Sequence, residues 1–260
     1  MSVLERFQLN GKRLFITGGS RGLGREMALA IASAGADVIL VGRTQSSLEE
    51  TAEEIRSLGR SAWTLQGEMS DLSECERVCK QAVADLGPID ILINNVGGRR
   101  ENIPTENMPT ETWLRLLDLN LNSTFVCTRI IGDAMIQRGL GGRVINISSI
   151  NGLVAGANIQ GRHYETAKAA VIQFTRSIAV DWAQHRITAN VICPGGFMTE
   201  PNRRWSESNP EVIESFRKQI PLGDFGQPED LGPLALYLAS DAARYVTGAV
   251  HVIDGGYTLI

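Results

Sequence analysis

Tyr164 and Lys168 lie four positions apart, shortly after a serine pair at Ser148 and Ser149. On a helix, positions i and i+4 share a face, so the lysine ammonium would lie beneath the phenol ring. A nearby cation favours the tyrosinate, and lowering a tyrosine pKa from about 10 by two or three units needs roughly 3 to 4 kcal/mol. Tyr164 would then act as an acid or base near neutral pH. Because such pairs are common on helix surfaces, the rest of the chain must decide whether this one does chemistry.

A glycine-rich turn follows the first expected strand and precedes a helical pattern. The turn consists of Thr17, Gly18, Gly19, Ser20, Arg21, Gly22, Leu23 and Gly24. Glycines let the backbone turn tightly and approach a pyrophosphate, and the next helix offers free N–H groups with a positive dipole. A turn of this kind between the first strand and the first helix predicts a dinucleotide site.

The end of the second expected strand bears on which dinucleotide binds. An acidic residue there would bind the ribose 2′-hydroxyl of NAD, whereas a 2′-phosphate calls for arginine. The strand ends at Gly42 and Arg43 without an acid, and Arg21 adds a second cation. Arginine can bind a phosphate through two parallel hydrogen bonds. We therefore favour NADP over NAD as the cofactor.

Composition excludes several other classes of protein. The chain has 260 residues, 43% of them hydrophobic, and a net charge of −4, which argues against binding to nucleic acid or an anionic membrane. Its four cysteines form no disulfide framework, which favours a reducing cytoplasm. Cys75 and Cys79 are interpreted as helical packing at i and i+4, and the three histidines have no zinc spacing. We therefore expect a cytoplasmic protein without a metal.

Short apolar runs alternate with longer amphipathic segments. The expected strands are residues 14–17, 38–41, 62–66, 89–94, 144–147, 188–192 and 249–253. Such alternation is typical of parallel strands joined by right-handed crossovers. It predicts an α/β chain with a single-domain Rossmann fold, in which helices cover both faces of a doubly wound, seven-stranded parallel sheet. Ser46 with Glu49, and Asp71 with Glu74, are expected to begin two of the helices as capping boxes.

No linker or repeat divides the chain, so we expect residues 1–260 to form one dinucleotide-binding and catalytic domain. The stretch from 195 to 220 interrupts the alternation with Pro201, Pro210 and the run Arg203, Arg204 and Trp205. Ligands in doubly wound folds bind outside the carboxyl ends of the strands. This segment is therefore a candidate substrate lid or a subunit contact.

These motifs together resemble the short-chain dehydrogenase/reductase family from about residue 12 to residue 257. The matching residues, in chain order, are Thr17, Gly18, Gly22 and Gly24 of the glycine turn, Asn94, Asn95 and Gly97, Asn120, Ser149, Tyr164 and Lys168, Pro194, Gly195 and Thr199, then the segments 227–230 and 247–256. Glu68 replaces the usual aspartate after the third strand, and Val96 replaces an alanine. The stretch from Ser149 to Tyr164 is two residues longer than usual, which predicts an enlarged loop over the substrate at residues 151–162.

The resemblance implies an oxidoreductase that moves hydride between a nicotinamide and an alcohol or carbonyl. It implies that Ser149 binds the substrate oxygen, Tyr164 transfers the proton, Lys168 lowers the tyrosine pKa and binds the nicotinamide ribose, and Asn120 holds a water near that lysine. The implied cofactor contacts are Thr17, Gly18, Gly19, Ser20, Arg21, Gly22, Leu23, Gly24, Arg43, Glu68, Met69, Asn95, Gly97, Tyr164, Lys168, Pro194, Gly195, Phe197 and Thr199. A homotetramer built through the long helices and the C-terminal strand is the family expectation.

The substrate is expected to be small and polar. Arg99 and Arg100 follow the turn at Gly97, and Arg162 and His163 precede Tyr164, so cations would surround the pocket mouth. A sugar acid or another hydroxy or keto acid would suit them, and gluconate 5-dehydrogenase-like members of the family are similar here. The alternative enzyme is a 3-oxoacyl-[acyl-carrier-protein] reductase, with Arg129 and Arg176 as docking cations. The non-enzyme alternative is a dinucleotide-sensing or scaffolding protein.

Overall fold

Seven parallel strands form one sheet in the part of the chain that the structure describes. This computed structural model describes residues 2–156 and 160–260, without the side chains of Pro201 and Trp205. The strands are β1 (Arg13–Thr17), β2 (Asp37–Gly42), β3 (Ala62–Gln66), β4 (Ile91–Asn94), β5 (Gly142–Ile147), β6 (Ile187–Pro194) and β7 (Val250–Ile253). Their order across the sheet is β3-β2-β1-β4-β5-β6-β7. The predicted fold class is confirmed, and every expected strand is found with its bounds within two residues.

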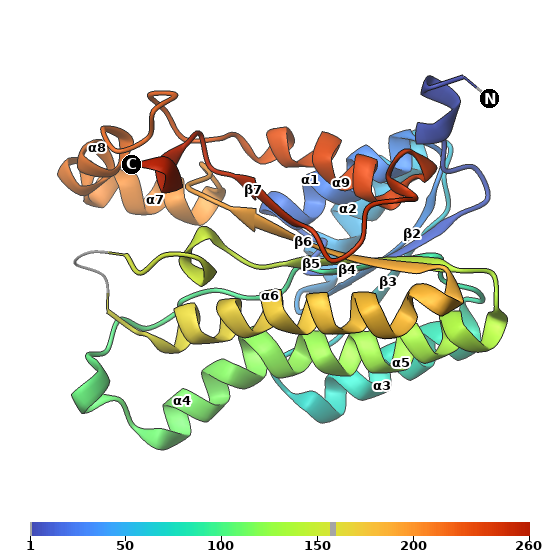
Figure 1. Cartoon of the computed structure of the whole chain (residues 1–260), viewed down its shortest axis with the longest axis horizontal. Helices are drawn as coiled ribbons and strands as arrows, with labels where there is room; N and C mark the ends of the chain where they lie inside the picture. The colour runs from blue at the N-terminus through green and yellow to red at the C-terminus, as the bar shows by residue number, and fades with distance from the viewer. Residues whose placement is uncertain (1, 157–159) are drawn as a thin grey trace.

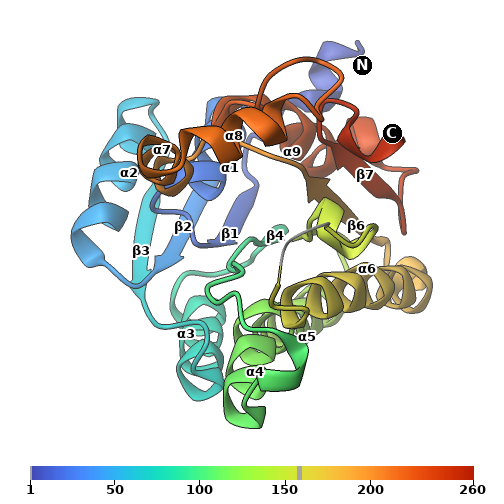
Figure 2. The same ribbon diagram turned by 90° about the vertical axis from the view of Figure 1, so that its left-hand side faces the viewer.

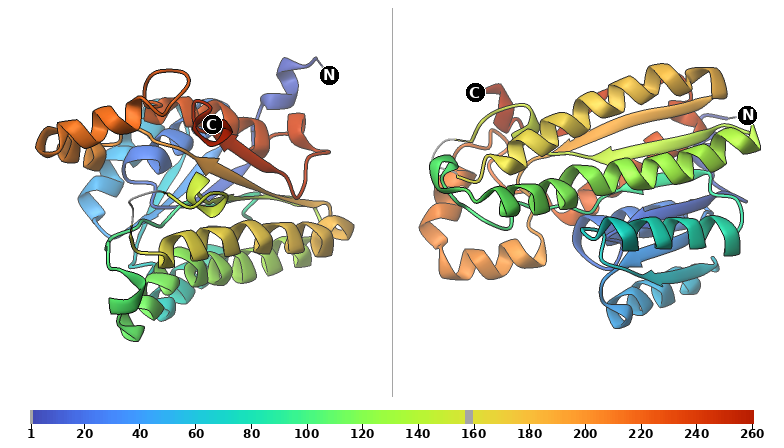
Figure 3. Two further views of the ribbon diagram at one scale, coloured as in Figure 1. Left: turned by 60° about the vertical axis from the view of Figure 1, so that its left-hand side comes forward. Right: turned by 90° about the horizontal axis from the view of Figure 1, so that it is seen from below.

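Two layers of helices cover the sheet (Figures 1 and 3). One face carries α1 (Gly22–Ser33), α2 (Gln45–Ser57) and α9 (Gly232–Ala239), and the other carries α3 (Leu72–Asp85), α5 (Ser123–Arg138) and α6 (His163–Trp182). Strand side chains alternate between the two layers: Leu14 and Ile16 pack with the first, and Phe15 packs with the second. The strands are rich in apolar residues because the central part of the sheet is buried on both faces.

The remaining elements are short. They are the helices α4 (Thr110–Leu117), α7 (Glu200–Ser208) and α8 (Pro210–Arg217), a π-helical turn (Asp118–Asn122), and 3₁₀ turns at Leu4–Phe7, Thr105–Asn107, Ile150–Gly152, Ala183–His185, Pro228–Leu231, Asp241–Ala243 and Tyr257–Leu259. No helix among the described residues is long and apolar enough to cross a membrane.

Asp71 begins a helix as expected, although the Glu74 carboxylate pairs with Arg77 and does not complete the capping box, and the cap expected at Ser46 is wrong. The carboxylate of Asp71 accepts hydrogen bonds from the backbone N–H groups of Ser73 and Glu74, at 2.9 and 3.2 Å, and α3 begins there. Ser46 instead lies inside α2, whose N-cap is Thr44 and which has no side-chain cap. The helix starts earlier because the chain leaves β2 at Gly42 and turns at once.

The expected lid consists of α7 and α8. Both lie at the end of the molecule where the strands finish (Figures 1 and 2). Helix α8 is held by a small apolar cluster in which the ring of Phe216 stacks on Phe225 and Tyr257, with centroid separations of 5.3 and 4.8 Å. The side chain of Trp205 lies outside the described residues. Its expected role in a lid or subunit contact is therefore left aside.

The sheet reverses its winding between β1 and β4. Strands β1, β2 and β3 run outward to one edge, and β4 then pairs with the other side of β1, with Phe15 opposite Leu92. The crevice at the carboxyl ends of the strands at such a switch point is the ordinary ligand site of a doubly wound sheet. The predicted site residues follow β1, β2, β3, β4, β5 and β6, so the fold gathers them at this edge.

Candidate active site

Helix α6 brings Tyr164 and Lys168 together as the spacing predicts. The helix begins at His163, so both residues belong to its first turns. Lys168 is only 2% exposed, its Nζ donates a hydrogen bond to the carbonyl oxygen of Ile147 at 2.9 Å, and the same Nζ lies 5.8 Å from the centre of the Tyr164 ring. The end of β5 therefore fixes the ammonium beside the phenol.

The expected direction of the Tyr164 pKa is wrong for this arrangement. Burial raises the pKa of Tyr164, although a hydrogen bond with Ser149 and the charge of Arg99 oppose that rise. Burial also lowers the pKa of Lys168 to about 8, because the site disfavours the ammonium itself. Desolvation thus outweighs the effects of Ser149 and Arg99 on Tyr164, and that of Cys193 on Lys168. The pair shares a face as expected, but Lys168 by itself does not make the tyrosine more acidic here.

The two serines after β5 have different roles. The hydroxyl of Ser148 donates to the carbonyl oxygen of Lys168 at 2.7 Å, which ties β5 to α6. The hydroxyl of Ser149 bonds Tyr164, donates to Oδ1 of Asn151 at 3.3 Å and accepts from the N–H of Asn151 at 3.1 Å. That the second serine is the reactive one stays a prediction, and the two hydroxyl groups differ in that Ser149 interacts with Tyr164 and Ser148 does not bond it.

Asn120 is completely buried in the π-helical turn between α4 and α5. Its amide nitrogen donates to the carbonyl oxygens of Leu116 and Gly98, at 2.9 and 3.1 Å, and its Oδ1 accepts from the N–H of Gly98 at 2.8 Å. A side chain at Gly97 would put a Cβ 2.8 Å from Nζ of Lys168 and 2.9 Å from Oδ1 of Asn120. The predicted asparagine, lysine and glycine thus meet at one point, and only glycine fits between the two polar groups.

The glycine turn after β1 is closely packed against itself. A Cβ on Gly24 would lie 2.1 Å from the carbonyl oxygen of Gly18, so a larger residue there would force the backbone apart. Gly18 has a φ of 69°, which favours glycine. A Cβ on Gly22 would lie 3.6 Å from Thr199, so the start of the lid segment lies directly over the turn. Thr199 was predicted as a cofactor contact, and the fold brings it to the expected place.

Thr17, at the end of β1, and Asn95, just after β4, form hydrogen bonds that connect these two parts of the chain. The hydroxyl of Thr17 accepts from the N–H groups of Asn95 and Val96 at 3.0 and 3.2 Å, and the Asn95 amide donates to the carbonyl oxygen of Thr17 at 3.1 Å. These bonds join the end of β1 to the end of β4. The two residues therefore shape the cofactor turn, and their predicted contact with the cofactor stays a prediction.

Other predicted cofactor residues lie around the same edge. Met69 and Phe197 are buried, at 1% and 4% exposure, and Phe197 pairs with Gly226 as an isolated bridge. Pro194 ends β6, and the N–H of Gly195 donates to the carbonyl oxygen of Ile253 at 2.9 Å. These residues are therefore packed into the carboxyl-terminal edge of the sheet, and their predicted contacts with the cofactor stay predictions.

Three arginines and Glu68 gather near the ends of β2 and β3. Nη1 of Arg43 lies 3.4 Å from Oε2 of Glu68, and both side chains are exposed, at 55% and 41%. Although partial burial opposes it, hydrogen bonds from Ser70 and the charge of Arg43 hold the pKa of Glu68 below its usual value. Burial lowers the pKa of Arg100, and the positive charges of Arg43 and Arg21 lower it further. Arg100 therefore interacts electrostatically with the charged groups at the ends of β2 and β3, and its expected place at the substrate mouth stays a prediction.

Arg99 lies over the predicted catalytic tyrosine. Its guanidinium carbon is 5.0 Å from the centre of the Tyr164 ring, and its Nη1 donates to the carbonyl oxygens of Gln160 and Gly161 at 2.7 and 3.1 Å. Its Nη2 is 3.6 Å from Oε1 of the buried Glu165. Arg99 and Arg100 are consecutive, yet Arg99 contacts Tyr164 and Glu165, whereas the charges that act on Arg100 are those of Arg43, Arg21 and Glu68.

Glu165 and His163 place Arg99, and the sequence reasoning gave neither of them this role. Oε1 of Glu165 also accepts from Nη1 of Arg162 at 2.7 Å and from the N–H of Gly156 at 3.3 Å. His163 is completely buried, and its Nε2 is 2.8 Å from the carbonyl oxygen of Arg99. Of the cations expected at the mouth, Arg99 thus faces Tyr164, whereas Arg162 is paired with Glu165. Residues 157–159 of the expected enlarged loop lie outside the described residues.

Comparison with known proteins agrees with this geometry. The protein-family profile described as enoyl-(acyl carrier protein) reductase matches residues 18–258. The chain is 35% identical to 2-dehydro-3-deoxy-D-gluconate 5-dehydrogenase of Dickeya dadantii over 98% of each chain. It is 37% identical to a short-chain type dehydrogenase/reductase from Mycobacterium marinum, with a TM-score of 0.90 and complete coverage of both chains. A gluconate 5-dehydrogenase from Burkholderia cenocepacia, solved with NADP and tartrate, is 31% identical with a TM-score of 0.91, also over the full length of both.

Three observations point to the same family: the similarity over the full length, the strand order, and the grouping of serine, tyrosine, lysine and asparagine at the switch point. The similar proteins named above are oxidoreductases. The chain therefore belongs to the short-chain dehydrogenase/reductase family and is an oxidoreductase of that family.

Proposed function

We propose that this protein is an NADP-dependent dehydrogenase or reductase of polar hydroxy and keto acids, with sugar acids as the substrate class. The observation that carries the substrate class is the position of Arg99, whose guanidinium lies 5.0 Å from the centre of the Tyr164 ring. A carboxylate bound by Arg99 would place a neighbouring alcohol or carbonyl carbon close to the tyrosine. The similarity to a gluconate 5-dehydrogenase that was solved with NADP and tartrate supports the same class.

The proton chemistry falls to four side chains. Tyr164 would give a proton to the substrate oxygen in reduction and take it in oxidation. Ser149, which already bonds Tyr164, would bind the same oxygen where charge develops. Lys168 would hold the nicotinamide ribose, and Asn120 would fix the segment at Gly98 beside that lysine. The nicotinamide supplies the hydride chemistry when it is bound.

The residues around the crevice fit a dinucleotide with a 2′-phosphate. The close contact between Gly24 and Gly18 leaves no room for side chains at the turn where a pyrophosphate would approach. Arg21 and Arg43 affect the pKa of Arg100, so three guanidinium groups share the region beyond β2. Three cations beside one carboxylate favour an added phosphate over a ribose hydroxyl. We propose NADP as the preferred cofactor on this basis.

The substrate class is tested with gluconate and glucitol, which differ in a carboxylate and a hydroxymethyl group. NADPH absorbance reports turnover of the purified protein with each compound and with the corresponding keto compounds. Gluconate should be the better substrate. An Arg99→Ala variant should lose roughly 10-fold to 100-fold in kcat/KM for gluconate, because a charged hydrogen bond is worth about 1.5 to 3 kcal/mol.

The same variant should lose much less with glucitol, and Arg99→Lys should recover part of the loss with gluconate. Equal losses for the acid and the polyol would show that Arg99 only supports Tyr164, and the substrate class would be wrong. The alternative, a reductase of acyl-carrier-protein substrates, has less support from the site, because Arg129, one of its expected docking cations, is paired with Glu76 at 3.1 Å. Turnover of either test compound would also exclude a purely dinucleotide-sensing protein.

We further propose a homotetramer and a mobile lid within one domain. A groove of about 480 Å³ runs along α5 and α6, and its lining includes Phe125, Phe174 and Trp182. An apolar groove of this kind is what a subunit contact would cover. Light scattering tests the tetramer.

The lid is tested by hydrogen exchange. Exchange in α7 and α8 should become slower after addition of NADPH and gluconate.

A further inference from the structure

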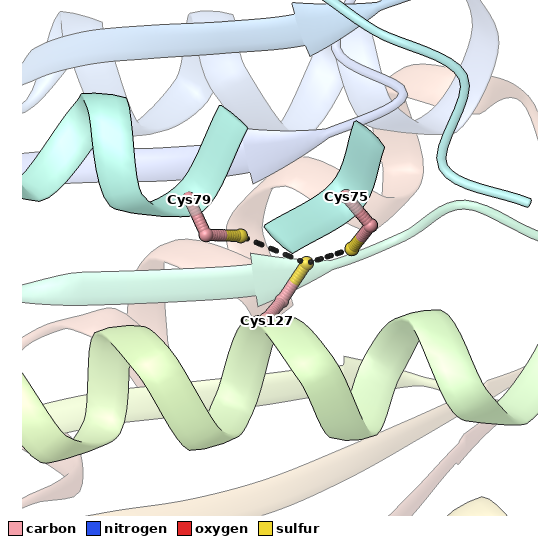
Figure 4. A group of neighbouring side chains, drawn as sticks. All are labelled: Cys75, Cys79 and Cys127. Carbon is pink, nitrogen blue, oxygen red and sulfur yellow. Dashed lines mark hydrogen bonds between the residues drawn. The ribbon is translucent and has the colours of Figure 1, made fainter. Parts of the chain in front are cut away.

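Three cysteine thiols from two helices point at one another in the layer that covers the sheet (Figure 4). Cys75 and Cys79 lie one turn apart on α3, and Cys127 faces them from α5. Sγ of Cys127 is 3.4 Å from Sγ of Cys75 and 3.5 Å from Sγ of Cys79. The three thiols are buried, with at most 1% exposure. The sequence showed only the pair on α3, which was interpreted as packing, because Cys127 lies 48 residues beyond Cys79.

The spacing of the sulfur atoms matches the size of a metal–thiolate site. All three sulfur atoms lie within 4.8 Å of one another. The point equidistant from them is therefore no more than about 2.4 Å from each, and zinc–thiolate bonds are about 2.3 Å long. Buried cysteines that serve only as small apolar side chains do not need to converge in this way. Little rearrangement would be needed to hold one ion.

We propose that Cys75, Cys79 and Cys127 form a binding site for one Cu(I) ion. Thiolates select soft ions, among them Cu(I) and zinc. Structural zinc takes four ligands, whereas among the described residues these three cysteines form the whole group. Their burial also leaves no exposed position for a water as a fourth ligand. A soft ion that accepts three sulfur ligands, as Cu(I) does, fits this set better than zinc.

Cys75 lies in the first turn of α3, whose N-terminal end carries a positive dipole that stabilises negative charge on a ligand there. On binding, a ligating thiol releases its proton to solvent and forms a sulfur–copper bond. Copper remains Cu(I), so no oxidant is required.

The site would join two segments that lead to the crevice. Helix α3 follows Glu68 and Met69, and α5 follows the turn that contains Asn120. Because the thiols are buried, copper must enter when α3 and α5 separate transiently. An ion that binds only the folded chain stabilises it by linkage. Copper should therefore raise the melting temperature of the protein.

The test uses the full-length reduced protein under anaerobic conditions, with Cu(I) supplied from a coloured chelator. We expect uptake of one equivalent, ultraviolet absorption from thiolate-to-copper charge transfer, and a higher melting temperature. Cys127→Ala removes the shared ligand and should weaken binding at least 10-fold. Cys193→Ala is the matched control, because this fourth cysteine is also buried but lies outside the cluster. Circular dichroism and NADPH binding check that each variant is folded.

If Cys127→Ala does not fold, Cys75→Ala and Cys79→Ala provide the same comparison one ligand at a time. Absence of copper uptake, or uptake that none of the three substitutions weakens, would overturn the proposal. Tighter binding of Zn(II) in the same competition would also overturn it. A disulfide between Cys75 and Cys127 that forms in air in protein that takes up no copper would point to a redox role instead.

Discussion

The buried centre of the crevice and its arginine rim are built in opposite ways. At the centre, Asn120 is inaccessible and Lys168 is 2% exposed, and each is held by backbone groups from a different part of the chain. At the rim, Arg43 and Arg162 have side chains that are 55% and 42% exposed, and they pair with Glu68 and Glu165. The centre has one arrangement of its polar atoms, whereas the rim can change partners at small cost.

This contrast assigns the proton transfer to the centre and the recognition of ligands to the rim. A rigid buried site can hold proton-transfer groups within hydrogen-bonding distance of one another, which the chemistry requires. Exposed guanidinium groups can exchange one carboxylate for another, or for a phosphate, when a ligand arrives. Substitutions at the centre should therefore affect every substrate, and substitutions at the rim should affect only some ligands.

The largest effect is expected for Tyr164→Phe. Loss of the hydroxyl removes the acid or base and should lower kcat by about 10³-fold for all substrates, within the usual range for such groups. NADPH affinity should change little, because the ring and Lys168 remain. Steady-state kinetics and fluorescence titration with NADPH measure the two quantities. Tyr245→Phe, at a side chain that is 99% exposed, is the control. Turnover above a tenth of the wild-type rate would remove Tyr164 from the mechanism.

The next effect concerns Lys168 and pH. The pKa of Lys168 is about 8 in the folded chain, against about 10.4 for a free lysine. Between these two pH values Lys168 is protonated in the unfolded chain but largely deprotonated in the folded chain. Stability should therefore rise from pH 8 to pH 10 and fall as pH drops through 8. Lys168→Met has no ammonium at this position and so lacks this pH dependence. The unfolding free energy of the wild type minus that of the variant should therefore increase by roughly 2 to 3 kcal/mol from pH 8 to pH 10.

Urea denaturation between pH 7 and pH 10 measures this difference. Lys218→Met, at a side chain that is 74% exposed, should follow the wild-type curve. A flat difference between wild type and Lys168→Met would mean that Lys168 titrates as a solvated side chain. The centre would then be less desolvated than its burial indicates.

The centre could be predicted from sequence more fully than the rim. Tyr164 and Lys168 belong to one helix, so local geometry places them on one face. Local spacing could not show that burial would raise the tyrosine pKa, since burial depends on the packing of several elements. Nor could it show that Arg99 lies over the Tyr164 ring while Arg100 interacts with Arg43 and Arg21, because these interactions join segments that are far apart in the sequence.

The strands were predictable for a similar reason. Their continuous apolar runs reflect burial on both faces, which is visible in the sequence itself. The cap at Asp71 was also found, because its side chain bonds the next turn of the same helix. The cap expected at Ser46 failed because the tight exit from β2 starts α2 before that residue. Features set by neighbouring residues were thus predicted, and those set by tertiary packing were not.

At the rim, Arg43→Asp should change cofactor preference without harming the centre. The substitution removes a cation near the expected 2′-phosphate and adds an acid suited to a ribose hydroxyl. The ratio of kcat/KM for NADPH to that for NADH should fall by about 10-fold to 100-fold, with little change in kcat. Kinetics with both cofactors at equal concentrations measure the ratio. A wild-type enzyme that already prefers NADH would show that the arginines do not select NADP.

The smallest effect is expected when the exposed pair of Arg43 and Glu68 is broken. Glu68→Gln keeps an oxygen that can accept from the N–H of Ser70 and removes only the charge facing Arg43, 3.4 Å away. Exposed pairs contribute little, so the loss of stability should be below about 0.5 kcal/mol. Asn120→Ala removes a completely buried amide and leaves the N–H of the partly buried Gly98 without its side-chain partner, so it should cost about 1 to 3 kcal/mol. Urea denaturation of the two variants compares rim and centre directly, and equal losses would mean that the rim is as rigidly specified as the centre.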